Sequence, residues 1–281
     1  MSWKLILACG LTIAVGLTAW CLYEYNRAAR GQNITQREST TKNQAIGMER
    51  ALEIIQRAQQ RLADIRDYRC QFLRKEFIDG EWKRNHVLLR VRHAPFSVYM
   101  EWLSDEPTKR GRKVVYHEHL KDKMRVRIPL LGIVREMDLE SSIRMKESRY
   151  TVAQAGIKNL TNRLAQRWQR EHELGLTQVE ELDVDLEIQV GTQTFRQPCT
   201  CIRTLHPSAH RETFQREGFL FHRTYVYFAK DGAAAGLPIQ LRGYDWPADG
   251  SDGEGPLVEE STYFQIECNL GLNEKDFELT H

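Results

Sequence analysis

Hydrophobic and polar positions divide the chain into an apolar start, a polar stretch and a long body of short alternating runs. The first run, Leu5 to Tyr23, contains no charged residue. A run of about 18 or more uncharged apolar residues is long enough to cross a bilayer as a helix. The stretch from 24 to 47 is rich in Arg, Gln, Asn, Ser and Thr, with few of the large apolar side chains that a core needs. We therefore expect a signal or membrane anchor at 1–23, a flexible linker at 24–47 and one folded domain at 48–281.

The first run fits either a retained anchor or a cleaved export signal. Signal-peptide apolar regions are usually ~7–15 residues long and end at a small-x-small site. This run is longer, and Leu17-Thr18-Ala19 is a poor cleavage site. Cys21 follows Trp20 rather than a small residue, which argues against lipid attachment. The arginines after the run favour a cytoplasmic body, whereas the four-residue tail before it is typical of export. We give export more weight, and cleavage stays open.

Two stretches of the body carry apolar residues at helical spacing. The second of them follows Thr151-Val152-Ala153-Gln154, which matches a capping box that bonds free backbone N–H groups. We expect one helix near the start of the body and one near its middle, each with an apolar stripe that packs against a sheet. The stripes are Met48, Leu52, Ile55, Leu62 and Ile65 in the first, and Ile157, Leu160, Leu164 and Trp168 in the second.

Most other runs alternate between apolar and polar residues with a period of two, which is typical of strands with one face in a core. The longest, residues 183 to 190, alternates without a break, and Asp79-Gly80 is a strong hairpin signal. The runs predict ten or eleven strands, hence an α+β domain with a large antiparallel sheet. A sheet of this size curls, and two helices are too few to cover its apolar face. What remains is a second sheet layer or a concave apolar cavity.

Side chains on the apolar faces of these runs are the candidates for lining such a cavity. The aromatic run from 219 to 228 is also consistent with an ordinary core, and both interpretations stay open. The candidate cavity residues are Tyr68, Phe72, Val98, Met100, Trp102, Phe219 and Tyr225.

Cysteine is the most suggestive reactive residue in the body. An even number of cysteines in an exported domain permits disulfides, and the alternative is buried free thiols that act as small apolar residues. A metal or redox role is disfavoured, because the C-x-C pair has no second ligand pair at a recognisable spacing. The candidates for disulfide formation are Cys70, Cys199, Cys201 and Cys268.

Charge and motifs exclude several function classes. The net charge of +2 is too balanced for a nucleic-acid binder. The chain lacks the motifs of serine hydrolases, P-loop enzymes, dinucleotide-binding folds and zinc proteases. His117-Glu118-His119 is too small a set to indicate zinc, and Glu259 with Glu260 is expected on the solvent side of a strand. We predict no catalytic residue, cofactor or metal site.

Several motifs of the body together resemble a known family. They are Arg90 to Met100 followed by Gly111 to Tyr116, then Ser148 to Thr151, Gly243 to Pro247 and Asn269 to Phe277. This combination resembles the bacterial family of unknown function DUF1571, over about residues 48 to 281. The resemblance implies an exported envelope protein whose fold is similar to that of the periplasmic lipoprotein carriers of the LolA/LolB type. That fold is a curved antiparallel half-barrel covered by helices. The resemblance brings no activity and no site residues.

Two functions from different classes follow. The first is an envelope protein, held at the membrane by Leu5–Tyr23 or released to the periplasm, that binds a lipid or acyl chain, or a lipoprotein, in the concave sheet. The second is a structural or interaction module of the envelope that holds no ligand and uses an exposed apolar patch. The ligand, the protein partners and the oligomeric state do not follow from the sequence.

Overall fold

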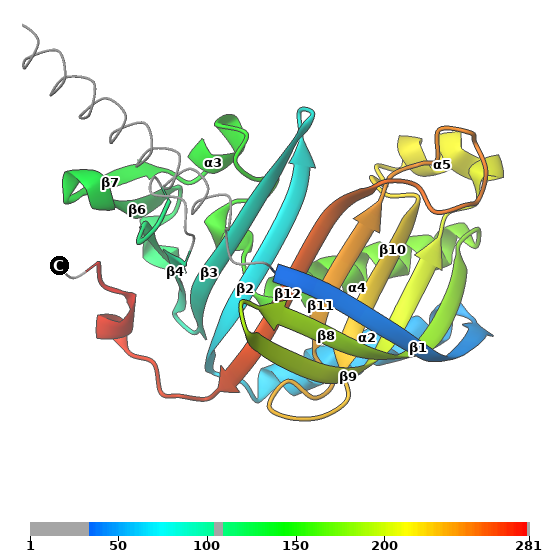
Figure 1. Ribbon diagram of the computed structural model, residues 1–281, viewed down its shortest axis with the longest axis horizontal. Coiled ribbons are helices and arrows are strands. Elements are labelled where there is room, and N and C mark those ends of the chain that lie inside the picture. Colours follow the sequence, from blue (N-terminus) through cyan, green and yellow to red (C-terminus); the bar gives the residue numbers. More distant parts are fainter. Residues whose placement is uncertain (1–33, 104–108, 280–281) are drawn as a thin grey trace, which may run out of the picture.

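A sheet of twelve antiparallel strands forms most of the protein in the computed structural model, which describes residues 34–103 and 109–279 (Figure 1). The predicted segment Leu5–Tyr23 and residues 24–33 lie outside the described residues. Within the described ranges, no helix is both long and apolar enough to cross a bilayer. The α+β class with a large antiparallel sheet is as the alternating runs predicted.

The strand order in the sheet is β1-β8-β9-β10-β11-β12-β2-β3-β4-β5-β6-β7. The strands are β1 Ile34–Ile46, β2 Asp67–Ile78, β3 Glu81–His93, β4 Phe96–Trp102, β5 Lys113–His117, β6 Lys123–Ile128, β7 Ile133–Asp138, β8 Gln178–Val190, β9 Gln193–Leu205, β10 Arg223–Ala229, β11 Pro238–Tyr244 and β12 Leu257–Cys268.

Two long helices, α2 (Met48–Ala63) and α4 (Ile157–Leu174), pack against each other on one face of the sheet. In α2 the side chains of Met48, Ile55 and Leu62 are buried, as the apolar stripe predicted, and Ala51 and Ala58 are fully buried beside them. The shorter elements are α3 Ser141–Arg144, α5 Arg211–Arg216, η1 Glu118–Leu120, η2 Pro129–Leu131, η3 Val152–Gln154, η4 Ser208–His210 and η5 Glu274–Phe277.

The start of α4 is fixed by a contact with the sheet. The capping box at Thr151 and Gln154 is present, but it caps the short turn η3 rather than α4. Helix α4 begins one residue after Gly156, which has a φ of +99°, and the Ile157 N–H donates to the Tyr68 hydroxyl at 2.8 Å. A Cβ at Gly156 would lie 2.8 Å from that hydroxyl oxygen, so glycine is needed there both for its φ and for space.

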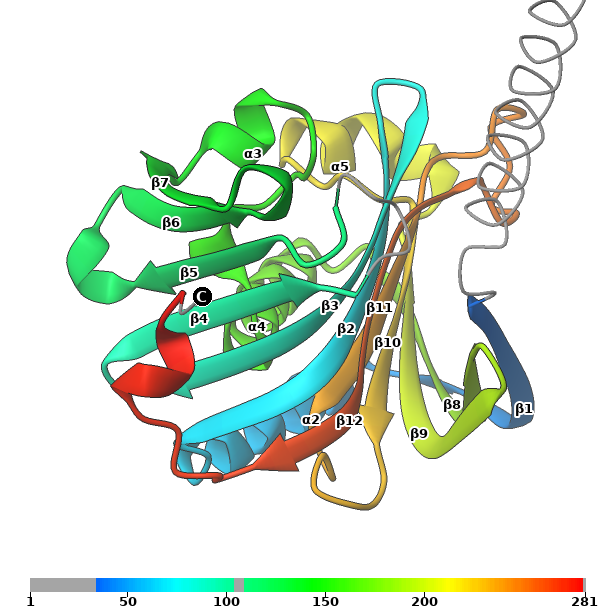
Figure 2. The ribbon, with the colours of Figure 1, turned by 60° about the vertical axis from the view of Figure 1, so that its left-hand side comes forward.

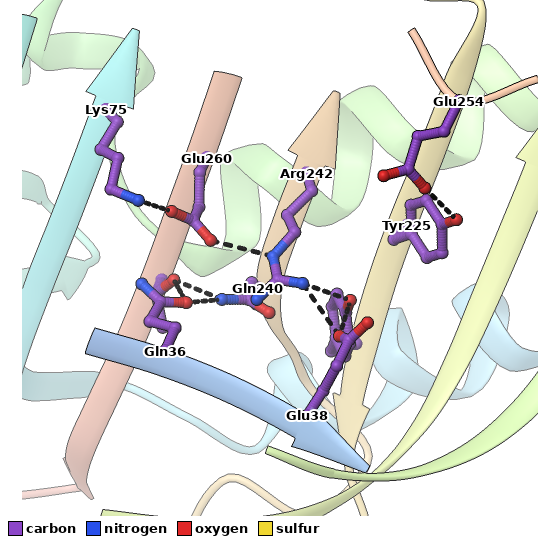
Figure 3. Close-up of polar contacts among 10 residues, drawn as sticks. Gln36, Glu38, Lys75, Tyr225, Gln240, Arg242, Glu254 and Glu260 are labelled. Carbon is purple, nitrogen blue, oxygen red and sulfur yellow. Dashed lines mark hydrogen bonds and ion pairs between the residues drawn. The ribbon is translucent and has the colours of Figure 1, made fainter. Parts of the chain in front are cut away.

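The expectation of a flexible linker up to residue 47 is wrong for residues 34–46, which form the edge strand β1 along β8. An edge strand draws its hydrogen bonds from the neighbouring backbone, so it needs no large apolar side chains of its own. Its polar side chains also bond to the outer face of β10 to β12, as Figure 3 shows. Glu38 accepts from Arg242 at 2.9 Å and from the Tyr227 hydroxyl, and Gln36 bonds to Gln240.

These contacts mean that the β1–β8–β9 end of the sheet folds back over the sheet's own outer face. Figure 2 shows this end on one side of β10 to β12, with α2 and α4 on the other side. A second core therefore lies between the folded end and the outer face of β10, β11, β12 and β2. The sequence left a second sheet layer and a cavity as alternatives. The structure contains both, a second layer here and a cavity at the other half of the sheet.

Candidate functional site

A cavity of about 240 Å³ lies between the helix-facing side of β2 to β7 and the segment that runs from α3 to α4. Its wall on the sheet side is apolar. Three methionines, Met100, Met124 and Met137, contribute to this wall, and flexible methionine side chains adapt to ligands of different shape. The principal apolar lining residues are Phe72, Met100, Trp102, Val114, Met124, Val126, Ile128, Met137, Met145, Leu160 and Leu241.

Strand register explains why these side chains meet. Met100 is the cross-strand partner of Val114, and Val114 is the partner of Val126. Directly paired residues in a sheet point to the same face. The apolar residues of β4, β5 and β6 therefore form one continuous row on that face. Met124 and Met137 continue the row onto β7.

One end of the cavity is polar and carries a pair of buried carboxyl groups. Glu259 of β12 is the cross-strand partner of Glu76 of β2, and their exposed fractions are 1% and 0%. The Tyr150 hydroxyl donates to Glu259 at 3.1 Å. Arg74 Nε lies 3.1 Å from a Glu76 oxygen, and the Arg149 backbone N–H donates to the other at 3.2 Å. Glu259, Arg74 and Tyr150 all face the cavity.

The electrostatics of this end favour a neutral Glu259. Burial, and then the negative charge of Glu76, raise the pKa of the Glu259 carboxyl to about 7. The Tyr150 hydroxyl, Arg149 and Arg74 act in the opposite direction without cancelling the rise. Near neutral pH this carboxyl is therefore shared between its protonated and ionised forms, and it serves as a hydrogen-bond donor in one and as an acceptor in the other.

Residues 145–151 cross the cavity on the side away from the sheet. Glu147 pairs with Arg112 at 3.1 Å, and the Arg149 guanidinium donates to the Phe77 carbonyl at 2.6 Å. Met145 lines the cavity although its side chain is 60% exposed. Side-chain contacts thus hold this segment to β2 and to the residue that precedes β5. The partly exposed Met145 is its apolar contribution to the cavity lining.

The seven residues predicted to line a cavity separate into three groups. Phe72, Met100 and Trp102 line it. Tyr68 and Val98 belong to the same helix-facing core but are not among its lining residues, and the Tyr68 hydroxyl is engaged with α4. Phe219 packs with Phe214 and Trp246 near α5, and Tyr225 lies in the second core, where it bonds to Glu254 at 3.0 Å (Figure 3).

The sequence interpretation missed the polar end. Glu259 and Glu260 were expected on the solvent side of a strand, but both are buried. Adjacent residues of a strand point to opposite faces, and here both faces of β12 are covered. Glu259 faces the cavity, while Glu260 pairs with Arg242 at 2.9 Å and with Lys75 at 2.5 Å on the outer face (Figure 3). Residues Val258 to Phe264 are all buried, but four of the seven are polar, so the sequence lacks the continuous apolar run that usually signals a strand covered on both sides.

The four body cysteines have free thiols in this structure. Cys199 and Cys201 lie in the second core, on the outer side of the sheet, whereas Cys70 lies in the helix-facing core and Cys268 packs against that core. A disulfide between Cys199 or Cys201 and Cys70 or Cys268 would have to join opposite faces of the sheet. Burial raises the pKa of the Cys70 and Cys201 thiols well above the usual range, which makes them unreactive.

A second hollow of about 490 Å³ lies on the outer face beneath the C-terminal turn η5. Its polar lining residues bond to neighbouring groups, since Glu274 pairs with Arg92 at 2.6 Å and His117 bonds to Ser97 at 3.1 Å. In the part of the chain that the structure describes, no group of three or more His, Cys, Asp or Glu residues is placed to hold a metal ion. We regard the first cavity as the candidate site, because it combines a continuous apolar wall with a buried polar end.

Comparisons with known proteins agree with the motifs of the body. A sequence model of a protein family, described as "Protein of unknown function (DUF1571)", matches residues 65–281. A search of the curated proteins gave no match.

Among solved structures, the chain is similar to a DUF1329 family protein from Desulfovibrio piger, with 12% identity and a TM-score of 0.42 over 83% of this chain and 97% of that chain. It is similar to the lipoprotein LppX of Mycobacterium tuberculosis, with 11% identity and a TM-score of 0.43 over 80% and 98%. It is also similar to a LolA superfamily protein from Nitrosomonas europaea, with 10% identity and a TM-score of 0.39 over 81% and 97%. At these scores the likeness carries no argument about function, which rests on the cavity.

Proposed function

The chain belongs to the DUF1571 family, and from its cavity we propose that it is a cell-envelope protein that binds one apolar chain, such as the acyl chain of a lipid. The observation that carries the proposal is the row of Met100, Val114 and Val126, whose side chains face a cavity instead of packing against a helix. We propose binding rather than catalysis, because most of the side chains that line the cavity are apolar and the Tyr150 hydroxyl is engaged with Glu259.

The size of the cavity limits the ligand. A volume of about 240 Å³ is at the small end for ligand pockets, which usually measure ~300–1,000 Å³. One chain fits this space better than the paired chains of a diacyl lipid. Each methylene group that leaves water contributes about 0.8 kcal/mol, which corresponds to about a fourfold gain in affinity. Affinity should therefore rise with chain length and level off once the cavity is filled.

The N-terminal run supports a location at the membrane. We propose that Leu5–Tyr23 directs the protein to the inner membrane and holds the body in the periplasm, or releases it there if the segment is cleaved. Cell fractionation, with N-terminal sequencing of the mature protein, tests this. Recovery of the full-length chain in a cytosolic fraction would contradict it.

Native mass spectrometry of gently purified protein tests the binding proposal, and the expected result is a co-purified lipid. Val126→Phe places extra volume in the cavity and should abolish the lipid adduct, because Val126 lines the wall. The matched control is Val134→Phe on the neighbouring strand, where the side chain is 48% exposed and does not line the cavity. A lipid-free mass for the wild type, or equal lipid in both variants, would refute binding in this cavity.

A second candidate, an interaction module of the envelope, is favoured by one observation. Large apolar side chains are exposed on η2, on β7 and in and just after α3, namely Leu131, Ile133, Val134, Ile143 and Met145. Such a patch marks a contact surface more often than chance exposure does. Leu131→Glu, compared with Leu220→Glu on an equally exposed leucine elsewhere, should then weaken association with the envelope even if no lipid is bound.

A further inference from the structure

We propose that the polar end of the cavity, at Glu259, Tyr150 and Ser261, binds an uncharged, hydroxyl-bearing headgroup and excludes the carboxylate of a free fatty acid. This inference rests on the proposed function and deepens it by naming the headgroup. It concerns one class of ligand, a single-chain amphiphile with an uncharged polar head.

The geometry places these groups around one point at the end of the apolar wall. Glu259 and Ser261 are two residues apart on β12 and point to the same face, and both line the cavity. Their cross-strand partners on β2 are Glu76 and Arg74. Tyr150 closes the end from the segment before α4, with its hydroxyl on Glu259 at 3.1 Å. A headgroup here meets a carboxyl, a phenol and a hydroxyl, all of which form hydrogen bonds with an alcohol.

The arginines of the cavity are already engaged elsewhere. Arg74 lies 3.1 Å from Glu76, and Arg112 lies 3.1 Å from Glu147. The Arg163 guanidinium of α4 stacks over the Tyr150 ring at 4.8 Å and donates to the Gln154 carbonyl. An anionic headgroup would have to displace one of these contacts to gain a cationic partner, so the arginines do not form a ready-made anion site.

The carboxyl pair disfavours a third negative charge. The charged and titratable groups that face Glu259 are Glu76 and Arg74 on β2, and Arg149 and Tyr150 on the covering segment. Together with burial they hold the pKa of Glu259 at about 7. A fatty-acid carboxylate at this position would meet the same loss of hydration and the same Glu76 charge. A hydroxyl carries no charge, accepts from protonated Glu259 and donates to its ionised form.

Three probes with the same twelve-carbon chain test the inference by calorimetric titration of the full-length protein at pH 8. They are monolauroylglycerol, laurate and dodecylammonium. At this pH Glu259 is mostly ionised, and we expect monolauroylglycerol to bind at least about tenfold more tightly than laurate, the effect of one pKa unit of differential interaction. We also expect it to bind more tightly than dodecylammonium, because burial penalises either ion and the positive charges of Arg74 and Arg149 already act on Glu259 and repel a further cation.

Glu259→Gln removes the charge and keeps the shape. It should raise the affinity for laurate about tenfold relative to the affinity for monolauroylglycerol, because the Gln amide can still donate to and accept from a hydroxyl but no longer repels a carboxylate. In the wild type, laurate should bind more tightly as the pH falls from 8 to 6, and this trend should be shallower in the variant. Should Glu259→Gln fold poorly, Glu76→Gln provides the same comparison, because it removes the other negative charge and is expected to shift laurate binding in the same direction.

Equal binding of all three probes would overturn the headgroup inference and leave the apolar-chain proposal standing. Tighter binding of laurate or of dodecylammonium to the wild type at pH 8 would overturn it in the same way, as would a laurate affinity that neither variant raises. Absence of binding by every probe would overturn both proposals.

Discussion

Glu76 and Glu259 stand directly opposite each other on β2 and β12, and both side chains are withdrawn from solvent. Two carboxyl groups in this position cannot both ionise freely, because each charge would lose its hydration and would repel the other. Arg74 lies 3.1 Å from Glu76 and offsets its negative charge, so Glu259 is the carboxyl whose pKa rises. The charge at the polar end of the cavity therefore changes with pH near neutrality.

The first prediction concerns the stability of the protein as a function of pH. The folded state binds the Glu259 proton more tightly than the unfolded state, whose glutamate pKa is about 4.3. The stabilising effect of this proton is complete below about pH 4.3 and is lost as the pH rises through the folded pKa of about 7. The loss from this one group is about 4 kcal/mol at most. In urea unfolding at pH 8, Glu259→Gln should be more stable than the wild type, and a less stable variant would contradict the burial of a strained carboxyl.

The second prediction concerns the junction before α4. Gly156→Ala adds a Cβ at a φ of +99° and 2.8 Å from the Tyr68 hydroxyl. We expect a loss of about 2–3 kcal/mol in the free energy of unfolding, from backbone strain and from the displaced hydroxyl. Gly80→Ala is the control, since Gly80 has a φ of +83° but no atom within 4 Å of the added Cβ. Equal losses in the two variants would show that the Tyr68 contact contributes nothing.

The third prediction concerns the attachment of β1. Glu38→Ala removes the acceptor for Arg242 and for the Tyr227 hydroxyl, and Arg242 then loses one of its two carboxylate partners. We expect a loss of about 1–3 kcal/mol and faster amide hydrogen exchange in β1, with β2 and β3 unchanged. Glu187→Ala breaks the exposed pair with Arg196 on the same end of the sheet and should change stability by less than about 1 kcal/mol. Unchanged exchange in β1 would mean that the backbone pairing with β8 alone holds the strand.

The fourth prediction concerns the free thiols. Cys268 is half-buried, whereas Cys70, Cys199 and Cys201 are buried. Among these four cysteines, alkylation of the native protein, mapped peptide by peptide, should label Cys268 first, and the other three only when the protein unfolds. Disulfide-linked peptides in a non-reduced digest would contradict this result and would restore the pairing that the sequence left open.

The sequence predicted the parts of the fold that depend on one buried face. The α2 stripe and the alternating runs around Met100 and Met124 satisfy that condition, and the family resemblance is confirmed by the match over residues 65–281. Several failures come from the folding of the sheet over its own outer face. That folding gives polar β1 a partner, covers Tyr225, and buries Glu260 beside Arg242 on the outer side. Glu259 is buried on the other side, where the segment that carries Tyr150 covers it. The alternation of apolar and polar residues along a strand indicates which side chains share a face. It does not indicate whether other parts of the protein cover one face or both.

The two outermost strands of the sheet are β1 and β7, so the N-terminal 33 residues join the domain at one edge while the strands that wall the cavity end at the other. Residue 34 and the apolar wall of β4 to β7 thus lie toward opposite ends of one hydrogen-bonded sheet. A change before residue 34 adjoins the edge strand β1, none of whose residues lines the cavity. Replacing the first 33 residues with another segment should therefore leave the ligand preference that we propose for the cavity unchanged.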